Sequence, residues 1–140
     1  YQTPVLEPTD ELISRLTLPN GFRVTKFAQD LPNPRVIEVA SDGSVYVTSR
    51  ETGQCFLLRD TDRDGVADQQ SVVLRQPGLH GIAISPDETK VYFVTVRELF
   101  VTDRNRDGTL SAPTLIFNDL PDAGQHPNRT MGFGPDGKLY

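Results

Sequence analysis

The sequence has few of the residues that mark several common classes of protein. Its 140 residues include one cysteine, one methionine and no tryptophan. A single cysteine excludes an internal disulfide, and the apolar run around Cys55 favours a buried structural thiol. No stretch of about 18 apolar residues is present to span a membrane, and no charged-then-apolar leader opens the chain at Tyr1. The sequence therefore predicts a soluble protein, or a mature form whose signal has been removed.

Clusters of basic residues are also missing. The chain has 19 acidic and 14 basic residues and a formal net charge of −5. A surface of this kind offers no electrostatic footprint for a phosphate backbone, so we expect no nucleic acid partner. Hydrophobic residues make up 36% and charged residues 24% of the chain, which is ordinary for a folded globular protein.

A repeat of nearly 50 residues organises the rest of the chain. Three segments each contain a short apolar strand, a turn with an aspartate, and a returning strand. The turn residues Asp42, Asp87 and Asp136 are separated by 45 and 49 residues, the spacing expected of four-stranded propeller blades. The three strand pairs are expected at residues 35–40 and 45–48, 81–84 and 91–94, and 130–133 and 138–140.

Two more strands are expected in each of the first two repeats, at residues 54–59 and 70–75 and at 98–103 and 113–118. In these segments β-branched and aromatic residues alternate with polar ones, and Gly, Pro, Asp and Asn fill the gaps. The predicted fold class is therefore all-β. It consists of β-propeller blades of four antiparallel strands, with about two blades and the start of a third in an incomplete ring.

The ends of the chain carry further predictions. Residues 22–27 resemble an outermost strand that would complete the last blade of a ring and so remove a free sheet edge. We therefore expect a longer natural polypeptide, or other chains that complete the ring. Residues 1–17 are predicted to be an N-terminal extension with a short helix capped by Thr9 or Asp10. Residues 18–140 are predicted to be the N-terminal part of the propeller domain.

Two aspartate-rich loops match the start of a calcium-binding loop, D-x-[DN]-x-D-G, in which alternate side-chain oxygens aim at one point. Neither has the glutamate at position 12 or the flanking helices of an EF-hand, and metal-free hairpin turns are the alternative. Each loop falls between the third and fourth strands of its blade, so the sequence predicts calcium sites that brace the blades rather than catalyse. The candidate ligands are Asp60, Asp62, Asp64 and Asp68 in the first loop, and Asp103, Asn105 and Asp107 in the second.

Three other loops lead into the inner strands and are expected to converge at the opposite end of the propeller. They span residues 31–35, 76–80 and 120–129, and they contain both histidines of the chain, His80 and His126. Histidine has an unperturbed pKa of about 6.5 and is a natural general base near neutral pH. A surface histidine without a catalytic role is the alternative for each.

Residues 124–140 and 18–22 resemble the active-site segment and the opening of the pyrroloquinoline-quinone (PQQ) sugar dehydrogenases. This family includes the soluble glucose, aldose sugar and L-sorbosone dehydrogenases. Its catalytic base stands eight residues before a Gly-Pro-Asp-Gly turn, so the resemblance implies that His126 is the base. It also implies that Gln76, five residues before the glycine at 81, contacts the quinone. Arg129 and His80 are implied to contribute to the cofactor site, as in the sorbosone-like branch.

The resemblance implies an oxidoreductase that passes a hydride from an aldose or related sugar or aldehyde to the quinone. The implied cofactors are PQQ and Ca²⁺, and the implied partners are a sugar and an electron acceptor such as a cytochrome or a quinone. The implied location is the periplasm or the outside of the cell. The remaining quinone ligands, and the calcium that polarises the cofactor, are implied to lie beyond Tyr140.

Two alternatives stay open. One is a metal-dependent propeller lactonase, for which Glu38 is the only candidate ligand on an inner strand. The other is a non-catalytic, calcium-stabilised binding propeller whose channel face docks a glycan or a protein. Quinone-dependent dye reduction separates the dehydrogenase from both, and metal removal separates the lactonase from the binding protein.

Overall fold

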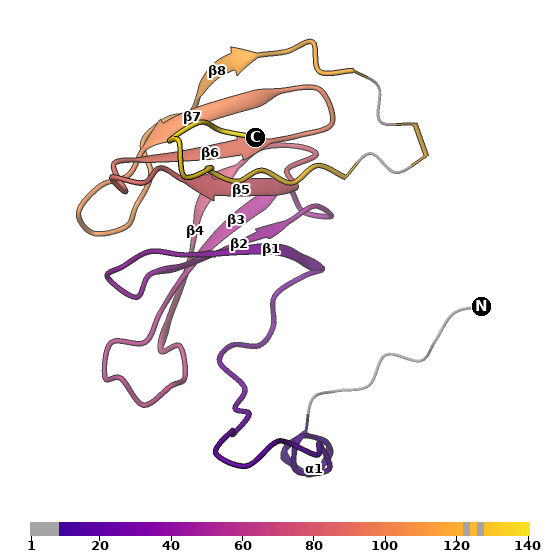
Figure 1. Cartoon of the computed structure of the whole chain (residues 1–140), viewed down its shortest axis with the longest axis vertical. Helices are drawn as coiled ribbons and strands as arrows, with labels where there is room; N and C mark the ends of the chain where they lie inside the picture. The colour runs from indigo at the N-terminus through magenta and orange to yellow at the C-terminus, as the bar shows by residue number, and fades with distance from the viewer. Residues whose placement is uncertain (1–8, 122–123, 126–127) are drawn as a thin grey trace.

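The computed structural model of the chain describes residues 9–121, 124–125 and 128–140. Two four-stranded antiparallel sheets make up most of it (Figure 1). In each sheet the strands follow one another in chain order, β1-β2-β3-β4 and β5-β6-β7-β8. The first sheet contains β1 (Pro34–Val39), β2 (Val45–Ser49), β3 (Gln54–Arg59) and β4 (Gln69–Arg75). The second contains β5 (Gly81–Ile84), β6 (Lys90–Val94), β7 (Leu99–Asp103) and β8 (Thr114–Phe117).

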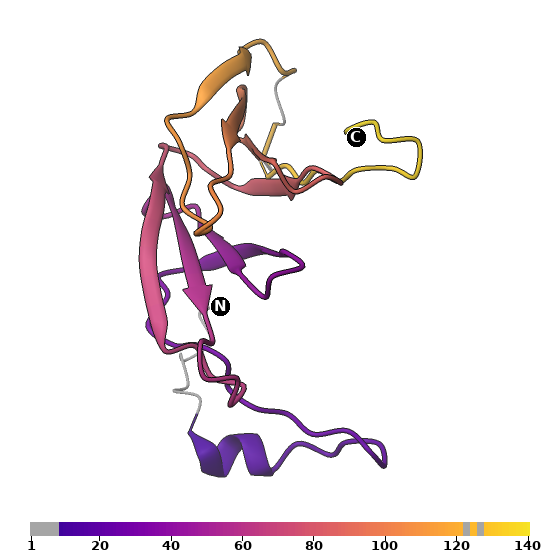
Figure 2. The same cartoon turned by 90° about the vertical axis from the view of Figure 1, so that its left-hand side faces the viewer.

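This arrangement confirms the predicted all-β class and the two four-stranded blades. A third repeat begins where it was expected, because Phe133 forms an antiparallel bridge with Leu139. The backbone of Gly132 also exchanges hydrogen bonds with Tyr140, at 2.9 and 3.1 Å. The two sheets do not close on each other, so together they form part of a ring (Figure 2).

The helix α1 (Asp10–Ser14) lies inside the predicted N-terminal extension and apart from the sheets (Figure 1). Thr9 is its N-cap, as predicted, and the Thr9 hydroxyl accepts a hydrogen bond from Leu12 N at 3.3 Å. None of the described helices is long and apolar enough to cross a membrane.

Residues 22–27 form no strand among the described residues. This segment was predicted to pair with the last blade of the ring, which is neither of the two sheets, so that pairing stays a prediction. A strand needs a neighbour that offers a ladder of backbone partners, and none of the described strands pairs with this segment. The end of the segment contacts the first sheet instead. Ala67 N donates to Phe27 O at 2.8 Å, and Phe27 packs with Ala28 and Leu31 on the apolar face of that sheet.

The main hydrophobic core lies between the two sheets. Tyr46, Ile82 and Phe93 are fully buried there, and Ile82, Phe93 and Phe100 lie side by side in neighbouring strands. Burying a side chain of this size contributes about 1.5–3 kcal/mol to folding. Alternate residues along a strand point to the same face of its sheet. In each sheet, one such row of apolar residues packs against the other sheet.

The turns of the two sheets gather at two opposite ends. The β1–β2 and β3–β4 turns, and the equivalent β5–β6 and β7–β8 turns, lie on the left in Figure 1. The β2–β3 and β6–β7 turns lie on the right, together with the loop between β4 and β5 and the segment after β8 (Figure 1). We call the right-hand end the convergent end, because the predicted quinone-site loops meet there.

Candidate functional site

At the convergent end, hydrogen bonds join loops that are far apart in the sequence. Arg50, just after β2, donates to the Asn128 side-chain oxygen at 2.6 Å. Leu120 N, in the segment after β8, donates to Arg97 O in the β6–β7 turn at 3.0 Å. The described part of the 120–129 loop is therefore bonded to the β2–β3 turn of the first sheet and to the β6–β7 turn of the second.

His80 and Arg129, two of the predicted cofactor ligands, are in direct contact. The His80 ring Nδ1 lies 2.8 Å from Arg129 O. His80 itself is buried, and its backbone N–H donates to Val94 O at 3.0 Å as β5 begins. The carbonyl of His80 accepts a hydrogen bond from the Thr48 hydroxyl at 2.6 Å. The imidazole thus joins the β4–β5 loop to the start of the third repeat.

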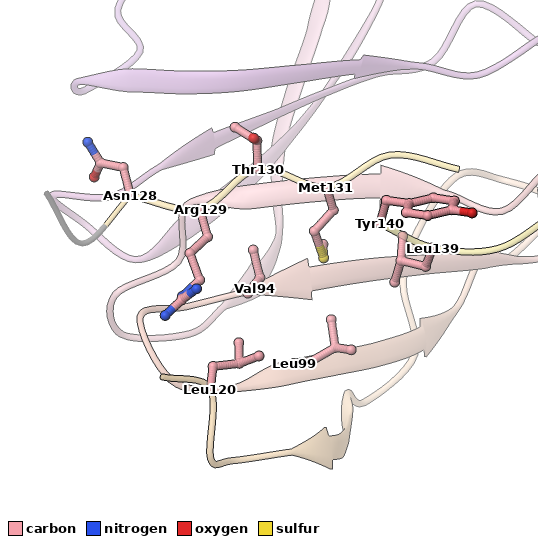
Figure 3. A pocket seen from close by; sticks show the side chains of 9 residues that line it. All are labelled: Val94, Leu99, Leu120, Asn128, Arg129, Thr130, Met131, Leu139 and Tyr140. Carbon is pink, nitrogen blue, oxygen red and sulfur yellow. The ribbon is translucent and has the colours of Figure 1, made fainter. Parts of the chain in front are cut away.

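The guanidinium of Arg129 is bonded to backbone oxygens. Its Nε donates to Val96 O at 2.6 Å, and its Nη2 donates to Pro121 O. Figure 3 shows Arg129 and Met131 pointing from the last segment toward β6 and β7, where Val94 and Leu99 lie. Arg129 therefore ties the end of the 120–129 loop to its beginning and to the β6–β7 turn.

A groove of about 380 Å³ lies between the second sheet and the third repeat (Figure 3). Most of its lining side chains are apolar, which suits the packing of one blade on the next better than recognition of a polar molecule. The residues that line it are Val94, Leu99, Leu120, Asn128, Arg129, Thr130, Met131, Leu139 and Tyr140.

Gln76, the predicted quinone ligand, begins the β4–β5 loop and is held there through its backbone. Gln76 N donates to Gly53 O at 2.7 Å, and Gln76 O accepts from Leu79 N at 3.2 Å. Gly53 has a positive φ of 62°, and a Cβ at Gly53 would lie 2.7 Å from Gln76 O. A glycine is therefore required at this position for the two turns to approach each other.

Arg35 and Arg50 were not among the site residues predicted from the sequence. Both line a small polar groove at the convergent end, together with Asn33 and Glu51. Arg35 lies at the start of β1 and Arg50 just after β2, and neither belongs to a recognisable motif. Their proximity follows from the pairing of β1 with β2, in which Pro34 lies opposite Ser49. The signal available in the sequence was this expected hairpin register.

His126, the predicted catalytic base, lies outside the described residues, so its role stays a prediction. Glu38, the candidate of the lactonase alternative, lies on β1 and is half-buried. Its burial raises the pKa of the Glu38 carboxyl above the ordinary 4.5. Among the described residues, Glu38 does not belong to a group of three metal-binding side chains.

The first calcium-type loop brings its three carboxylates together at the opposite end of the sheet. Oxygens of Asp60, Asp62 and Asp64 all lie within 4.8 Å of one another. The Asp60 carboxylate accepts from Asp64 N at 3.1 Å and from Gly65 N at 2.9 Å, which bends the loop around it. Asp68 bonds elsewhere, since its Oδ2 accepts from the backbone and the hydroxyl of Thr61. Three of the four predicted ligands are therefore close together.

The second loop has a different arrangement, in which its predicted ligands have protein partners. Asp103 forms an ion pair with Lys90 at 2.7 Å. The Asn105 amide donates to the Thr109 hydroxyl at 3.0 Å. Asp107 accepts from the Thr109 hydroxyl at 2.6 Å and from Thr109 N at 3.0 Å, and these bonds lower the pKa of its carboxyl.

The second loop also contacts the first sheet, as expected of a brace between blades. The Tyr46 hydroxyl donates to Gly108 O at 2.7 Å and accepts from Arg104 Nε at 2.9 Å. Arg59, at the end of β3, donates to Asp107 O. This loop therefore fastens the second blade to the first.

Comparison with known proteins places these features in a family. A family model described as TrAA12-like matches residues 16–138. The holo PQQ domain of pyranose dehydrogenase from Coprinopsis cinerea superposes with a TM-score of 0.73 at 21% identity, over 86% of this chain and 29% of that chain. A carbohydrate-active enzyme of family AA12 from Trichoderma reesei gives a TM-score of 0.66 at 23% identity, over 79% and 29%.

The PQQ-bound aldose sugar dehydrogenase from Streptomyces coelicolor gives a TM-score of 0.66 at 24% identity, over 83% of this chain and 39% of that chain. This chain therefore spans between 29% and 39% of the length of these three structures. No curated protein sequence matches it. The match over residues 16–138 confirms the resemblance found in the sequence, and the chain belongs to the TrAA12-like family.

Proposed function

We propose that this chain is part of a PQQ-dependent oxidoreductase that oxidises an aldose or a related sugar or aldehyde. The observation that supports this most is the convergence of the Gln76 loop, His80 and the Asn128–Arg129 segment at one end of the blades. Pyranose dehydrogenase and aldose sugar dehydrogenase, whose solved structures resemble this chain, are described as a holo PQQ domain and as a PQQ-bound form.

The residues at the convergent end suit a quinone that carries several carboxylates. Guanidinium groups bind carboxylates through charge-assisted and often bidentate hydrogen bonds. Arg35 and Arg50 line a groove at this end, and Gln76 begins the neighbouring β4–β5 loop. These three residues of the chain are the ones we expect to hold the cofactor, with His126 beside the substrate.

The reaction is a two-electron oxidation of a carbon that bears a hydroxyl group. His126 accepts the hydroxyl proton while a hydride leaves the same carbon, so that a carbonyl forms. PQQ supplies the acceptor for that hydride when it is bound. Two hydrogen bonds hold the Gln76 backbone at the start of the β4–β5 loop, and we propose that the Gln76 side chain contacts the quinone from there. A cytochrome or a quinone is the proposed electron acceptor, and the periplasm or the outside of the cell is the proposed location.

We assign a structural rather than a catalytic role to calcium in the first loop. Carboxylate oxygens are the ligands that Ca²⁺ prefers, and Asp60, Asp62 and Asp64 offer three of them in one place. The loop lies at the end of the sheet opposite the convergent end (Figure 1). A cation there would neutralise the repulsion between the three carboxylates and stiffen the β3–β4 hairpin.

The test is reconstitution of the complete protein with PQQ and calcium, followed by an assay of sugar-dependent reduction of an artificial electron acceptor. Activity that requires PQQ is the expected result. His126→Ala is expected to lower kcat by about 10² or more without preventing quinone binding. Arg106→Ala, an exposed change at the opposite end of the blades, serves as the matched control and is expected to leave kcat unchanged.

Two results would overturn parts of this proposal. Undiminished turnover in the His126→Ala variant would remove His126 as the base. No turnover by the reconstituted protein, together with no change in the absorption spectrum of the quinone, would favour the binding propeller. Lactone hydrolysis that is lost on chelation of metal and independent of quinone would favour the lactonase.

A further inference from the structure

The peptide group of Arg129 is held against the dipeptide His80–Gly81. The His80 Nδ1 atom lies 2.8 Å from Arg129 O. A carbonyl oxygen can only accept a hydrogen bond, so Nδ1 bears the proton in this contact. Only 6% of His80 is exposed, and a bond shielded from water in this way is costly to lose.

Gly81 contributes to the same contact independently of the imidazole. A Cβ atom at Gly81 would lie 2.6 Å from Arg129 O and 3.3 Å from Arg129 C. The same Cβ would lie 2.6 Å from a methyl carbon of Val94. Any side chain here would therefore push the Arg129 carbonyl away from the second sheet. The Nδ1–H donor of His80 and the lack of a side chain at Gly81 therefore both stabilise the same position of the Arg129 carbonyl.

Further hydrogen bonds hold the His80 backbone and the Arg129 side chain in place. The Thr48 hydroxyl holds the His80 carbonyl at 2.6 Å, and Val94 O holds His80 N at 3.0 Å. On the other partner, the Arg129 guanidinium donates to Val96 O and Pro121 O. The His80 imidazole and the Arg129 guanidinium both donate to backbone oxygens. Side chains bonded in this way position the backbone of a site and are not free to bind a ligand through the same atoms.

We propose that His80 and Gly81 form a seat for the Arg129 peptide group, and that His80 is a positioning residue rather than a ligand of the quinone. The seat fixes residues 128–131, the start of the third inner strand, to the second sheet at the convergent end. The part of this inference that concerns the quinone rests on the proposed function. The seat itself depends only on the contacts of residues 80, 81 and 129.

Three variants of the complete protein test the seat. His80→Leu removes the donor, and Gly81→Ala keeps the imidazole but places a methyl group where the carbonyl lies. His80→Asn is the conservative variant, because an asparagine amide can donate from a position close to that of Nδ1. Loss of one buried hydrogen bond leaves a folded protein of ordinary stability largely intact.

The first measurement is hydrogen exchange of peptides that cover residues 128–133, without quinone. We expect exchange to be about tenfold faster in His80→Leu and Gly81→Ala, and most protection to return in His80→Asn. Peptides covering residues 60–68, at the opposite end of the first sheet, are the internal control and should not change. Unchanged exchange of residues 128–133 in both disruptive variants would overturn the seat.

The second measurement separates positioning from cofactor binding. In His80→Leu, kcat is expected to fall about tenfold, while the Kd for PQQ stays within about threefold and the spectrum of the bound quinone keeps its shape. A large rise in Kd with unchanged exchange would make His80 a quinone ligand instead. A wild-type protein that binds no PQQ would refute the proposed function, and the exchange measurement would still decide the seat.

Discussion

The Arg104 guanidinium donates to the Asp42 carboxylate at 2.5 Å across the interface of the two blades. Arg104 belongs to the second loop and Asp42 to the β1–β2 turn, 62 residues earlier. The Arg104 side chain is only 8% exposed, and the guanidinium also lies over the Tyr46 ring, 5.9 Å from its centroid. This ion pair and its tyrosine form a clasp between the first and second blades.

Breaking the clasp is expected to destabilise the protein. Arg104→Leu keeps much of the side-chain volume but removes the partner of Asp42 and a donor to the Tyr46 hydroxyl. We expect the free energy of unfolding to fall by about 1–3 kcal/mol, as measured by urea denaturation. Lys138→Leu is the control, because its exposed ion pair with Asp136 should be worth less than about 1 kcal/mol. Equal losses in the two variants would contradict the clasp.

The clasp is expected to weaken in acid. Partial desolvation raises the pKa of the Asp42 carboxyl, but hydrogen bonds from Ser44 and Arg104 outweigh it and bring the pKa below the ordinary 3.8. A carboxyl whose pKa is lower in the folded state stabilises the protein above about pH 4, and this contribution is lost as the pH falls below that value. The difference in unfolding free energy between wild type and Asp42→Asn should therefore shrink from pH 6 to pH 3. A constant difference would exclude this linkage.

Cys55 is expected to be inert in the folded protein. The side chain is fully buried on β3, and burial raises the pKa of the Cys55 thiol far above its ordinary value. Because the thiolate is the reactive form, a disulfide reagent such as DTNB should label it only after unfolding, even at pH 9. Rapid labelling in native buffer would show that the first blade opens locally.

Gly53→Ala is expected to disturb the Gln76 loop. A methyl group at residue 53 would lie 2.7 Å from Gln76 O, and the positive φ of 62° adds backbone strain. Under the proposed function the Kd for PQQ should rise by about tenfold or more. Gly43→Ala is the matched control, since Gly43 also has a positive φ, of 84°, but no atom would lie within 4 Å of the added methyl. Both variants should lose stability through backbone strain, Gly53→Ala should lose more because of the added clash, and only Gly53→Ala should lose affinity.

Calcium is expected to stabilise the protein through the first loop. Adding Ca²⁺ to chelator-treated protein should raise the Tm, and Asp62→Asn should lower the affinity for Ca²⁺ about tenfold or more. Asp119→Asn, an exposed carboxylate of the segment after β8, should leave the calcium response unchanged. A Tm that does not respond to Ca²⁺ in wild type would favour a metal-free hairpin turn.

The sequence by itself determined the strands and their grouping. Alternating apolar residues and the turn residues at 42 and 87 act over a few neighbours, so the eight strands of the two blades could be predicted to within one residue at each end. Segment 22–27 has the same local pattern but no neighbouring strand among the described residues, so it forms no strand there. Backbone pairing is a property of two segments, and one segment does not specify its partner.

Only the tertiary structure decided which side chains meet. The His80–Arg129 contact joins residues 49 apart in the sequence, and the clasp joins residues 62 apart. Both contacts depend on how the blades pack, which no local pattern encodes. Asp60, Asp62 and Asp64 lie together as the sequence predicted, because they share one loop. The loop of Asp103 and Asp107 bonds to the neighbouring blade, through Arg59 and Tyr46. Local spacing determines contacts within a turn, whereas contacts between blades are determined by the folded chain.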